Sequence, residues 1–151
     1  MIAELGTYLR ENITYDQCPE SLVDAFVSIE DSRYFQHFGF DIPRFTKAII
    51  ENLKNRDFGQ GGSTFTMQLV KNTYFSVDQG DQSVERTKSI EYKVQQIYLA
   101  IKLEKQLDKK TIFQLYVNKL NFGGNIRGVQ KASMMFFTAT PISAPMTSVF
   151  R

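Results

Sequence analysis

Residues 30–41 read EDSRYFQHFGFD, and this stretch decides how the chain is organised. Before it, apolar side chains recur at the helical spacing i, i+3, i+4 and i+7, in the order Leu22, Ala25, Phe26 and Ile29. This spacing predicts a helix that begins near Pro19 and ends at Glu30 and Asp31. The aromatic residues that follow break the helical pattern. We therefore expect two neighbouring carboxylates where a helix gives way to a loop.

The segment after this loop predicts a second helix. Asp41 is expected to cap it, with Pro43 in its first turn and an apolar face made of Phe45, Ala48, Ile49 and Leu53. The glycine-rich residues 57–62 predict a loop. Ser63 or Thr64 is then expected to cap a third helix.

Two longer helices are expected further along the chain. The third helix should run to about Tyr74, and the polar residues 76–83 predict a surface turn. A long helix follows over residues 84–107, with one stripe made of Ile90, Val94, Ile97, Ile101 and Glu104. Asp108 is expected to cap the next helix, whose inward side chains would be Ile112, Phe113, Tyr116, Val117 and Leu120.

Two glycines and a short tail complete the pattern. Gly123 and Gly124 are expected to end that helix, and a last helix is expected over about residues 126–137. The tail from Thr138 contains two prolines and offers no evident partner for the apolar side chains before it. We therefore predict a single, mainly α domain over residues 1–151 that is incomplete at its C-terminal end.

Composition and charge exclude several classes of protein. With 151 residues, of which 42% are hydrophobic and 23% charged, the chain can bury a core and does not belong to the disordered or collagen-like classes. A net charge of +2 gives no dense basic face, so we do not expect nucleic-acid binding. Cys18 and His37 each stand alone in the chain, so we expect no metal site built from cysteine or histidine clusters.

Glu30 is the first candidate for chemistry. A carboxylate at the end of a half-apolar helix and before aromatic residues is placed for partial desolvation, which favours a general base that works near neutral pH. The alternative is a solvated helix end at which Arg33 pairs locally, since exposed carboxylates are the common case. The residues alone leave both interpretations open.

Residues 61–72, GGSTFTMQLVKN, are the second candidate. Two glycines that lead into hydroxyl side chains at a helix start present amide groups and hydroxyls, which suits an anion such as phosphate. The alternative is an ordinary loop with a helix cap. Lys88 and Lys93 could face a diphosphate, but charged faces of long helices are usually only solvated. His37 alone is more often a structural residue than a base.

Taken in order, four segments resemble the motifs of the peptidoglycan glycosyltransferase domain, glycosyltransferase family 51, of class A penicillin-binding proteins and monofunctional transglycosylases. Residues 30–41 resemble E-D-x-x-[FY]-x-x-H-x-G-[FI]-D, and residues 61–72 resemble G-G-S-T-[IF]-T-x-Q-L-x-K-N. Residues 92–104 are similar to R-K-x-x-E-x-x-x-A-x-x-L-E, and residues 112–128 to I-x-E-x-Y-L-N-x-x-x-F-G followed by a glycine. The resemblance covers about residues 15–137.

This resemblance implies a lysozyme-like, mainly helical domain at the extracytoplasmic face of the bacterial cell membrane. The implied reaction polymerises lipid II into β-1,4-linked glycan strands, with inversion at the donor sugar and release of undecaprenyl diphosphate. The implied partners are lipid II, the growing glycan chain, the membrane surface and, in a parent chain, a C-terminal transpeptidase domain. Whether a divalent cation, Mg²⁺ or Mn²⁺, assists at the diphosphate stays open, because no metal-ligand spacing is present. We expect the family's membrane anchor to be absent, because no apolar stretch reaches the roughly 20 residues that span a bilayer.

The resemblance also assigns roles to single residues. Glu30 would be the general base that takes the acceptor's proton, with Tyr34 and Phe35 limiting its hydration. Substrate binding would fall to Asp31, Arg33, His37, Ser63, Thr64, Gln68, Lys71, Lys88 and Lys93. In this set the arginine and the lysines would hold phosphates, and the hydroxyl and amide side chains would give hydrogen bonds along the cleft. The predicted second helix would take the place of the family's membrane-dipping jaw, and the alternative is a plain core-facing helix.

The sequence departs from the family's pattern at four positions. Gln96 stands where the family has its second essential glutamate, and the other changes are Tyr92 for arginine, Met67 for glutamine and Gln114 for glutamate. A glutamine keeps the shape of a glutamate but cannot carry a negative charge or transfer a proton. We therefore keep two hypotheses: an active glycosyltransferase with Glu30 and Gln96 in the catalytic positions, and a catalytically impaired module that binds lipid II or glycan. Lysozyme-like hydrolysis would need a carboxylic acid to protonate the leaving oxygen, and the basic residues favour transfer instead.

Overall fold

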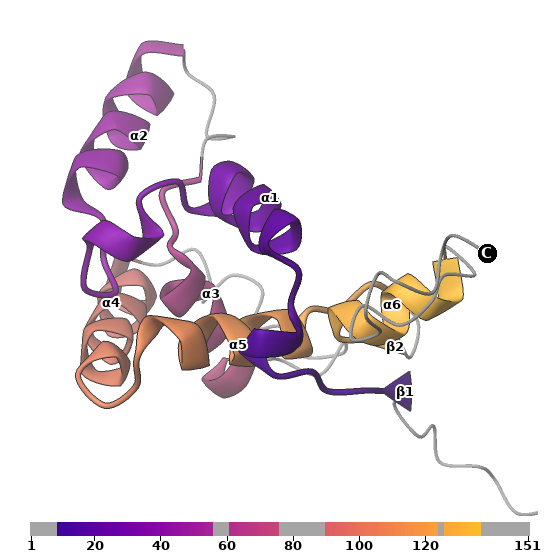
Figure 1. The fold of residues 1–151 in the computed structure, drawn as a ribbon. Helices are drawn as coiled ribbons and strands as arrows, with labels where there is room; N and C mark the ends of the chain where they lie inside the picture. The colour runs from indigo at the N-terminus through magenta and orange to yellow at the C-terminus, as the bar shows by residue number, and fades with distance from the viewer. Residues whose placement is uncertain (1–8, 56–60, 76–89, 124–125, 137–151) are drawn as a thin grey trace, which may run out of the picture.

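The computed structural model describes residues 9–55, 61–75, 90–123 and 126–136 of the chain (Figure 1). Over these residues the structure is mainly helical, as predicted. In chain order the helices are α1 Glu20–Glu30, α2 Ile42–Asn55, α3 Phe65–Tyr74, α4 Ile90–Glu104, α5 Lys109–Lys119 and α6 Val129–Phe136. Two short 3-10 turns, η1 Tyr15–Gln17 and η2 Tyr34–Gln36, lie before and after α1.

A short parallel pair of strands was not expected. β1 Leu9–Arg10 pairs with β2 Ile126–Arg127, so that the start of the described chain lies beside the segment between α5 and α6 (Figure 1). Strands of two residues have no period that a sequence pattern could reveal. The last helix therefore begins at Val129, after β2, and not at residue 126.

The predicted helix caps are confirmed. Asp41 and Asp108 immediately precede α2 and α5, and a carboxylate oxygen of each lies 2.9 and 2.7 Å, respectively, from an amide nitrogen of the first turn. Of the two candidates for α3, Thr64 is the cap, because its hydroxyl accepts a hydrogen bond from the Met67 amide at 3.2 Å. Each cap satisfies an amide that has no partner within the helix.

The core forms around α3, which packs against both α4 and α5. Its first residue, Phe65, is fully buried and meets three other aromatic rings. The ring centroids lie 4.9 Å from Tyr34, 5.7 Å from Phe113 and 4.5 Å from Tyr116. Such contacts between aromatic edges and faces add to the free energy gained by burial. The inward face predicted for α5 is confirmed by the burial of Ile112, Phe113, Tyr116 and Val117, with Leu120 partly buried beside them.

Two of the predicted apolar faces are wrong in part. Ile29, placed inward by its spacing on α1, is 77% exposed. On α4, Ile90 and Val94 are exposed, and the buried side carries Gln96 and Ala100. The helix turns a polar and a small residue inward because a loop and a cavity lie against that side, which apolar periodicity does not reveal.

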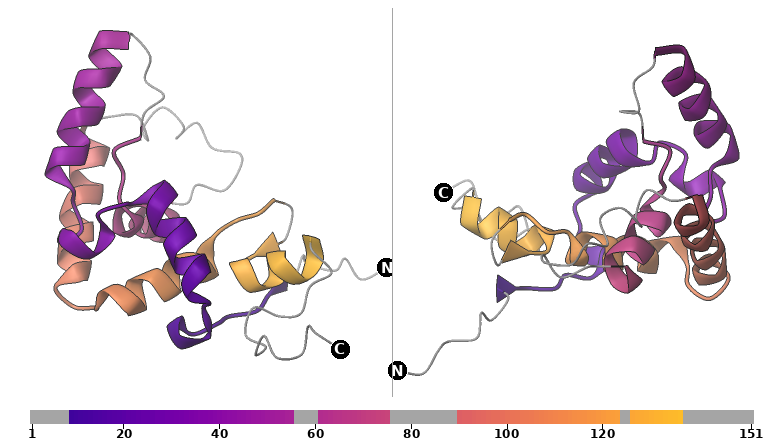
Figure 2. Two further views of the ribbon diagram at one scale, coloured as in Figure 1. Left: turned by 45° about the horizontal axis from the view of Figure 1, so that its top comes forward. Right: turned by 180° about the vertical axis from the view of Figure 1, so that it is seen from behind.

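α2 projects from the rest of the molecule in every view (Figures 1 and 2). Ala48 is its buried residue, whereas Ile42, Ile49, Ile50 and Leu53 are exposed. The interpretation of α2 as a core-facing helix is therefore wrong for most of its apolar side chains. Within the part of the chain that the structure describes, no helix combines the length and the apolar character needed to cross a membrane.

Several predictions lie outside the described residues. They concern the loop over residues 57–60, the turn over 76–83, the start of the long helix over 84–89 with Lys88, Gly124, and the tail from Thr138.

Gly39 and Gly123 give a matched test of how closely α4 packs. Both have positive φ, but a Cβ on Gly39 would lie 2.8 Å from the carbonyl group of Ala100, whereas one on Gly123 would meet open space. We expect Gly39→Ala to lower the free energy of unfolding by about 3 kcal/mol or more, since backbone strain and a clash combine. Gly123→Ala should cost only the strain, about 1–2 kcal/mol. Urea unfolding measures both, and equal losses would contradict the close contact with α4.

Candidate functional site

Glu30 is the last residue of α1, and its side chain is half-buried. The side-chain amide of Gln68, on α3, donates a hydrogen bond to Oε2 of Glu30 at 3.2 Å. The Tyr116 hydroxyl donates in turn to Oε1 of Gln68 at 3.2 Å. Burial, followed by the nearby Glu30 carboxylate, raises the pKa of Tyr116, so that its hydroxyl keeps its proton and remains a donor. This chain of donors holds Oε2 of the carboxylate, and none of the described residues donates a hydrogen bond to Oε1.

The groups that bind Glu30 differ from those expected from the sequence. Tyr34 is fully buried, and its hydroxyl donates to the backbone carbonyl of Lys109 at 2.6 Å. Phe35 is mostly exposed. Tyr116, which sequence reasoning placed only in the core, takes part in the site through Gln68.

Asp31, the next residue, has no exposed surface. Its Oδ2 accepts a hydrogen bond from the Phe65 amide at 3.0 Å, and both of its oxygens lie within 3.1 Å of Nε2 of His37. Thr64 is buried as well, and its hydroxyl donates to the carbonyl oxygen of Gly39 at 2.7 Å. Asp31, His37 and Thr64 were assigned to substrate binding from the sequence. In the structure they form the wall that joins the loop after α1 to the start of α3.

A metal ion does not fit among the acidic residues of this wall. The ligand atoms of Asp31, His37 and Asp41 lie within 4.8 Å of one another, and all three residues are buried. However, Arg33 binds both oxygens of Asp41, at 2.6 and 2.9 Å, and Arg44 lies 3.8 Å from Asp31. Burial alone would raise the pKa of Asp41, but hydrogen bonds from Arg33 and the Arg44 amide outweigh it and hold the pKa below its usual value. Arg33 thus already neutralises Asp41, and His37 and the Phe65 amide occupy the oxygens of Asp31, so neither carboxylate is left for Mg²⁺ or Mn²⁺.

A cavity of about 300 Å³ opens beside Gln68, where α3 and α4 meet. We call it the lysine cavity, and its lining consists of Ser63, Met67, Gln68, Lys71, Asn72, Lys93 and Gln96. The Lys93 ammonium donates to the Ser63 hydroxyl at 2.7 Å. Because Gln68 lines the cavity and also binds Glu30, the two lysines and the carboxylate belong to one site.

The lysine cavity suits an anion. Two ammonium groups, a hydroxyl and side-chain amides converge there, which is a donor set for phosphate oxygens. Burial and, second, the charge of Lys71 lower the pKa of Lys93. A negatively charged ligand would relieve this repulsion. The structure therefore brings together four of the predicted substrate-binding residues: Ser63, Gln68, Lys71 and Lys93.

Two of the departures from the family pattern fall in the lysine cavity. Gln96 lies one turn after Lys93 on α4 and is buried, and Met67 is fully buried in the wall. Among the described residues, no carboxylate lines this cavity. Gln114 has a different setting, because its Oε1 accepts a hydrogen bond from the Tyr15 amide at 2.9 Å. A glutamine makes that bond as well as a glutamate would.

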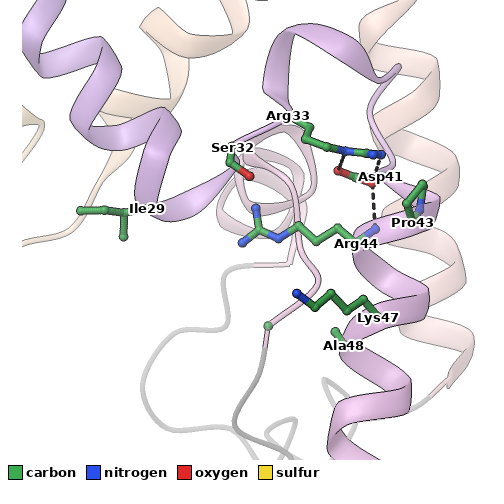
Figure 3. Close-up of a pocket in the computed structure, with 9 residues that line it drawn as sticks. Ile29, Ser32, Arg33, Asp41, Pro43, Arg44, Lys47 and Ala48 are labelled. Atoms are coloured by element: carbon green, nitrogen blue, oxygen red, sulfur yellow. Dashed lines mark hydrogen bonds and ion pairs between the residues drawn. The ribbon is translucent and has the colours of Figure 1, made fainter.

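A second and larger cavity, of about 630 Å³, lies between the end of α1 and the first half of α2 (Figure 3). We call it the arginine cavity, and the charged residues in its lining are Arg33, Asp41, Arg44 and Lys47. Sequence reasoning grouped Arg33 with the lysines of the other cavity. The structure separates them, since Arg33 lines this cavity and pairs with Asp41.

One buried ion pair was missed from the sequence. Glu104, expected in an apolar stripe, is bound by the Thr66 hydroxyl and by the Lys109 ammonium, which lies 2.7 Å from its Oε2. The same ammonium lies 4.5 Å from the centroid of the Tyr34 ring. The pair thus joins α3, α4 and α5 to η2. The signal was present, because a charged residue in an apolar stripe is rarely buried without a partner.

Comparisons with known proteins identify the family of the chain. A family profile described as transglycosylase matches residues 1–145. Penicillin-binding protein 1A of Clostridium botulinum (strain Langeland) is 43% identical over 129 residues, which are 83% of this chain and 14% of that protein. Penicillin-binding protein 1A of Streptococcus oralis is 39% identical over 137 residues, or 91% of this chain and 21% of that protein. Penicillin-binding protein 1A/1B of Bacillus subtilis (strain 168) is 34% identical over 142 residues, 94% of this chain and 15% of that protein. The chain thus spans about a fifth or less of the length of these relatives.

Removal of Lys71 should change the titration of Lys93. We expect Lys71→Ala to raise the pKa of Lys93, although burial, the larger cause, keeps it below the usual 10.5. The folded state holds this proton less tightly than the unfolded state, so Lys93 makes stability rise with pH between its lowered pKa and 10.5. Because Lys71→Ala raises the pKa of Lys93, the pH range over which Lys93 makes stability rise should become narrower. NMR titration of the lysine side chains measures the change, with Lys54→Ala, at an exposed lysine of α2, as the control. If Lys71→Ala left the pKa of Lys93 unchanged, the electrostatic interaction between the two lysines would be contradicted.

Proposed function

Because the chain belongs to the transglycosylase family, we propose that it is a peptidoglycan glycosyltransferase that polymerises lipid II into β-1,4-linked glycan. One observation supports this more than any other. Gln68 binds the Glu30 carboxylate and also lines a cavity that holds two lysines. The Gln68 side chain thus contacts both the proposed proton acceptor, Glu30, and the lysine cavity, the proposed site of the diphosphate leaving group.

Glu30 is the general base in this proposal. Its free carboxylate oxygen takes the proton from the 4-hydroxyl of the acceptor sugar as that oxygen attacks the anomeric carbon of the donor. Gln68 and Tyr116 keep the carboxylate oriented through their hydrogen bonds. Proton transfer by a positioned side chain contributes on the order of 10²–10⁴ to the rate.

Lys71 and Lys93 act on the leaving group. The new bond joins the acceptor oxygen to the anomeric carbon, and the bond from that carbon to the diphosphate oxygen breaks with its electron pair. The released undecaprenyl diphosphate carries that negative charge, which the two ammonium groups and the Ser63 hydroxyl stabilise without rearrangement. Attack from the side opposite the leaving group inverts the configuration of the donor sugar. A diphosphate leaves without a protonated acid, whereas hydrolysis of a glycosidic bond needs one.

We place the reaction at the extracytoplasmic face of the cell membrane. The exposed apolar residues of α2 support this, because an apolar helix face can rest among lipids. Both substrates carry lipid chains, so a site at the membrane surface can receive them. A transpeptidase domain in a longer parent chain belongs to the same proposal, since the relatives are penicillin-binding proteins of much greater length.

The general base gives the first test of the proposal. We expect Glu30→Gln to lower the rate of polymer formation by about 10²–10⁴, because the amide cannot take a proton. The chain is incubated with lipid II and a divalent ion in detergent, and the polymer is measured on a gel. Glu20→Gln, an exposed position at the other end of α1, is the matched control and should keep full activity. Polymer that persists at the normal rate in Glu30→Gln would refute the assignment of the base.

A second candidate function is binding without turnover. The observation that favours it is the buried Gln96, which stands in the lysine cavity where the family has a glutamate. Such a module would hold the lipid diphosphate through Lys71 and Lys93 but would not transfer the sugar.

Restoring the carboxylate separates the two candidates. If the chain is an active transferase, we expect it to make polymer unaided and Gln96→Glu to change the rate by less than about tenfold, since the base and the ammonium groups are intact. The same gel assay measures both proteins. Polymer made by Gln96→Glu but not by the unsubstituted chain would favour the binding module.

A further inference from the structure

We propose that the arginine cavity binds the phosphodiester headgroup of an anionic bilayer lipid. Within the described part of the chain, it shares no lining residue with the lysine cavity. The proposal concerns attachment to the membrane and not the transfer reaction, so either can fail without the other.

The cations of this cavity converge from one helix. Arg44 and Lys47 lie three residues apart on α2, and Figure 3 shows both side chains extending from the helix into the same space, toward Ser32 and the end of α1. Side chains three residues apart are neighbours on a helix surface. A guanidinium, an ammonium and a hydroxyl therefore face one volume of about 630 Å³, large enough for a phosphate with its substituents.

The charges of the cavity suit a single phosphate. Arg33 uses two of its nitrogens on Asp41, so it is largely neutralised. Arg44 lies 3.8 Å from Asp31, beyond hydrogen-bond distance, and Asp31 is already bound by His37 and Phe65. Lys47 is 73% exposed and lies 3.7 Å from a carboxylate oxygen of Glu51, in a pair too solvated to hold it. Two cations thus remain for a phosphodiester, which carries one negative charge.

The position of the cavity along α2 favours a lipid over a soluble anion. The far half of the projecting helix exposes Ile49, Ile50 and Leu53, and the near half carries the two cations. At a rise of 1.5 Å per residue, Lys47 and Arg44 lie about 9 and 14 Å from Leu53 along the helix axis. The headgroup layer of each leaflet is about 5–8 Å thick. When the far end of α2 enters the hydrocarbon edge by several ångströms, the cations reach the level of the phosphates.

Binding to vesicles tests the proposal. The chain is mixed with phosphatidylcholine vesicles with and without phosphatidylglycerol, and the bound fraction is measured by sedimentation at low salt. We expect Lys47→Gln to weaken the binding that depends on phosphatidylglycerol about fivefold, and Arg44→Gln with Lys47→Gln about 25-fold, since each basic residue near an anionic surface contributes roughly equally. The single variant alters only an exposed side chain, so it stays folded if the double variant does not.

A matched control separates the cavity from general charge attraction. Lys102→Gln with Lys105→Gln removes two exposed lysines of the α4 end and should weaken binding by less than about twofold. Equal losses in the two double variants would overturn the proposal. A further arm uses phosphatidylcholine vesicles that carry undecaprenyl diphosphate, which we expect the Arg44 and Lys47 variants to bind as the unsubstituted chain does. If the variants no longer bind undecaprenyl diphosphate but still bind phosphatidylglycerol, the arginine cavity binds the diphosphate substrate and the proposal is wrong.

Discussion

A carboxylate without exposed surface, that of Asp31, joins the two segments from which the site is built. It accepts the Phe65 amide at the first turn of α3 and pairs with His37 from the loop after α1. A buried charge is tolerated only when it is paired and hydrogen-bonded, and removal of one partner costs about 3–5 kcal/mol. The loop and the helix start are therefore held in one arrangement. The contact between Asp31 and the Phe65 amide therefore helps to position the α3 residues that line the lysine cavity.

Neighbouring carboxylates have different roles because their side chains point to different sides of the chain. Asp31 turns into the wall, whereas Glu30 remains half-buried and is held by Gln68 from the second turn of α3. Both contacts reach the same helix, so the distance between the Glu30 carboxylate and the lysine cavity is fixed by α3. Preorganisation of this kind lowers the cost of arranging charges during a reaction.

The sequence predicted what depends on neighbours along the chain and missed what depends on packing between elements. Helix caps such as Asp41 and Thr64 are local, because the capping side chain and its amide partner are three residues apart. Motif residues with a shared helix, such as Gln68 and Lys71, also came together as expected. The inward face of α4 could not be predicted, because the close approach of Gly39 to Ala100 selects it. The separation of Arg33 from the lysines has the same origin, since its partner Asp41 turns it toward α2.

The neutral side chain at position 96 has an electrostatic consequence that follows from its neighbours. A glutamate there would offer Lys93, one turn away, a partner inside the cavity, and a diphosphate would then compete with that ion pair. With glutamine at position 96, the Lys93 ammonium binds the Ser63 hydroxyl and has no carboxylate partner among the described residues. The positive charges of Lys71 and Lys93 repel each other. The cavity is therefore more strongly biased toward an anionic ligand than its glutamate counterpart would be. In the proposed reaction, a neutral residue here would therefore favour binding of the diphosphate while it removes a carboxylate, and we expect binding and turnover to respond separately to substitution at this position.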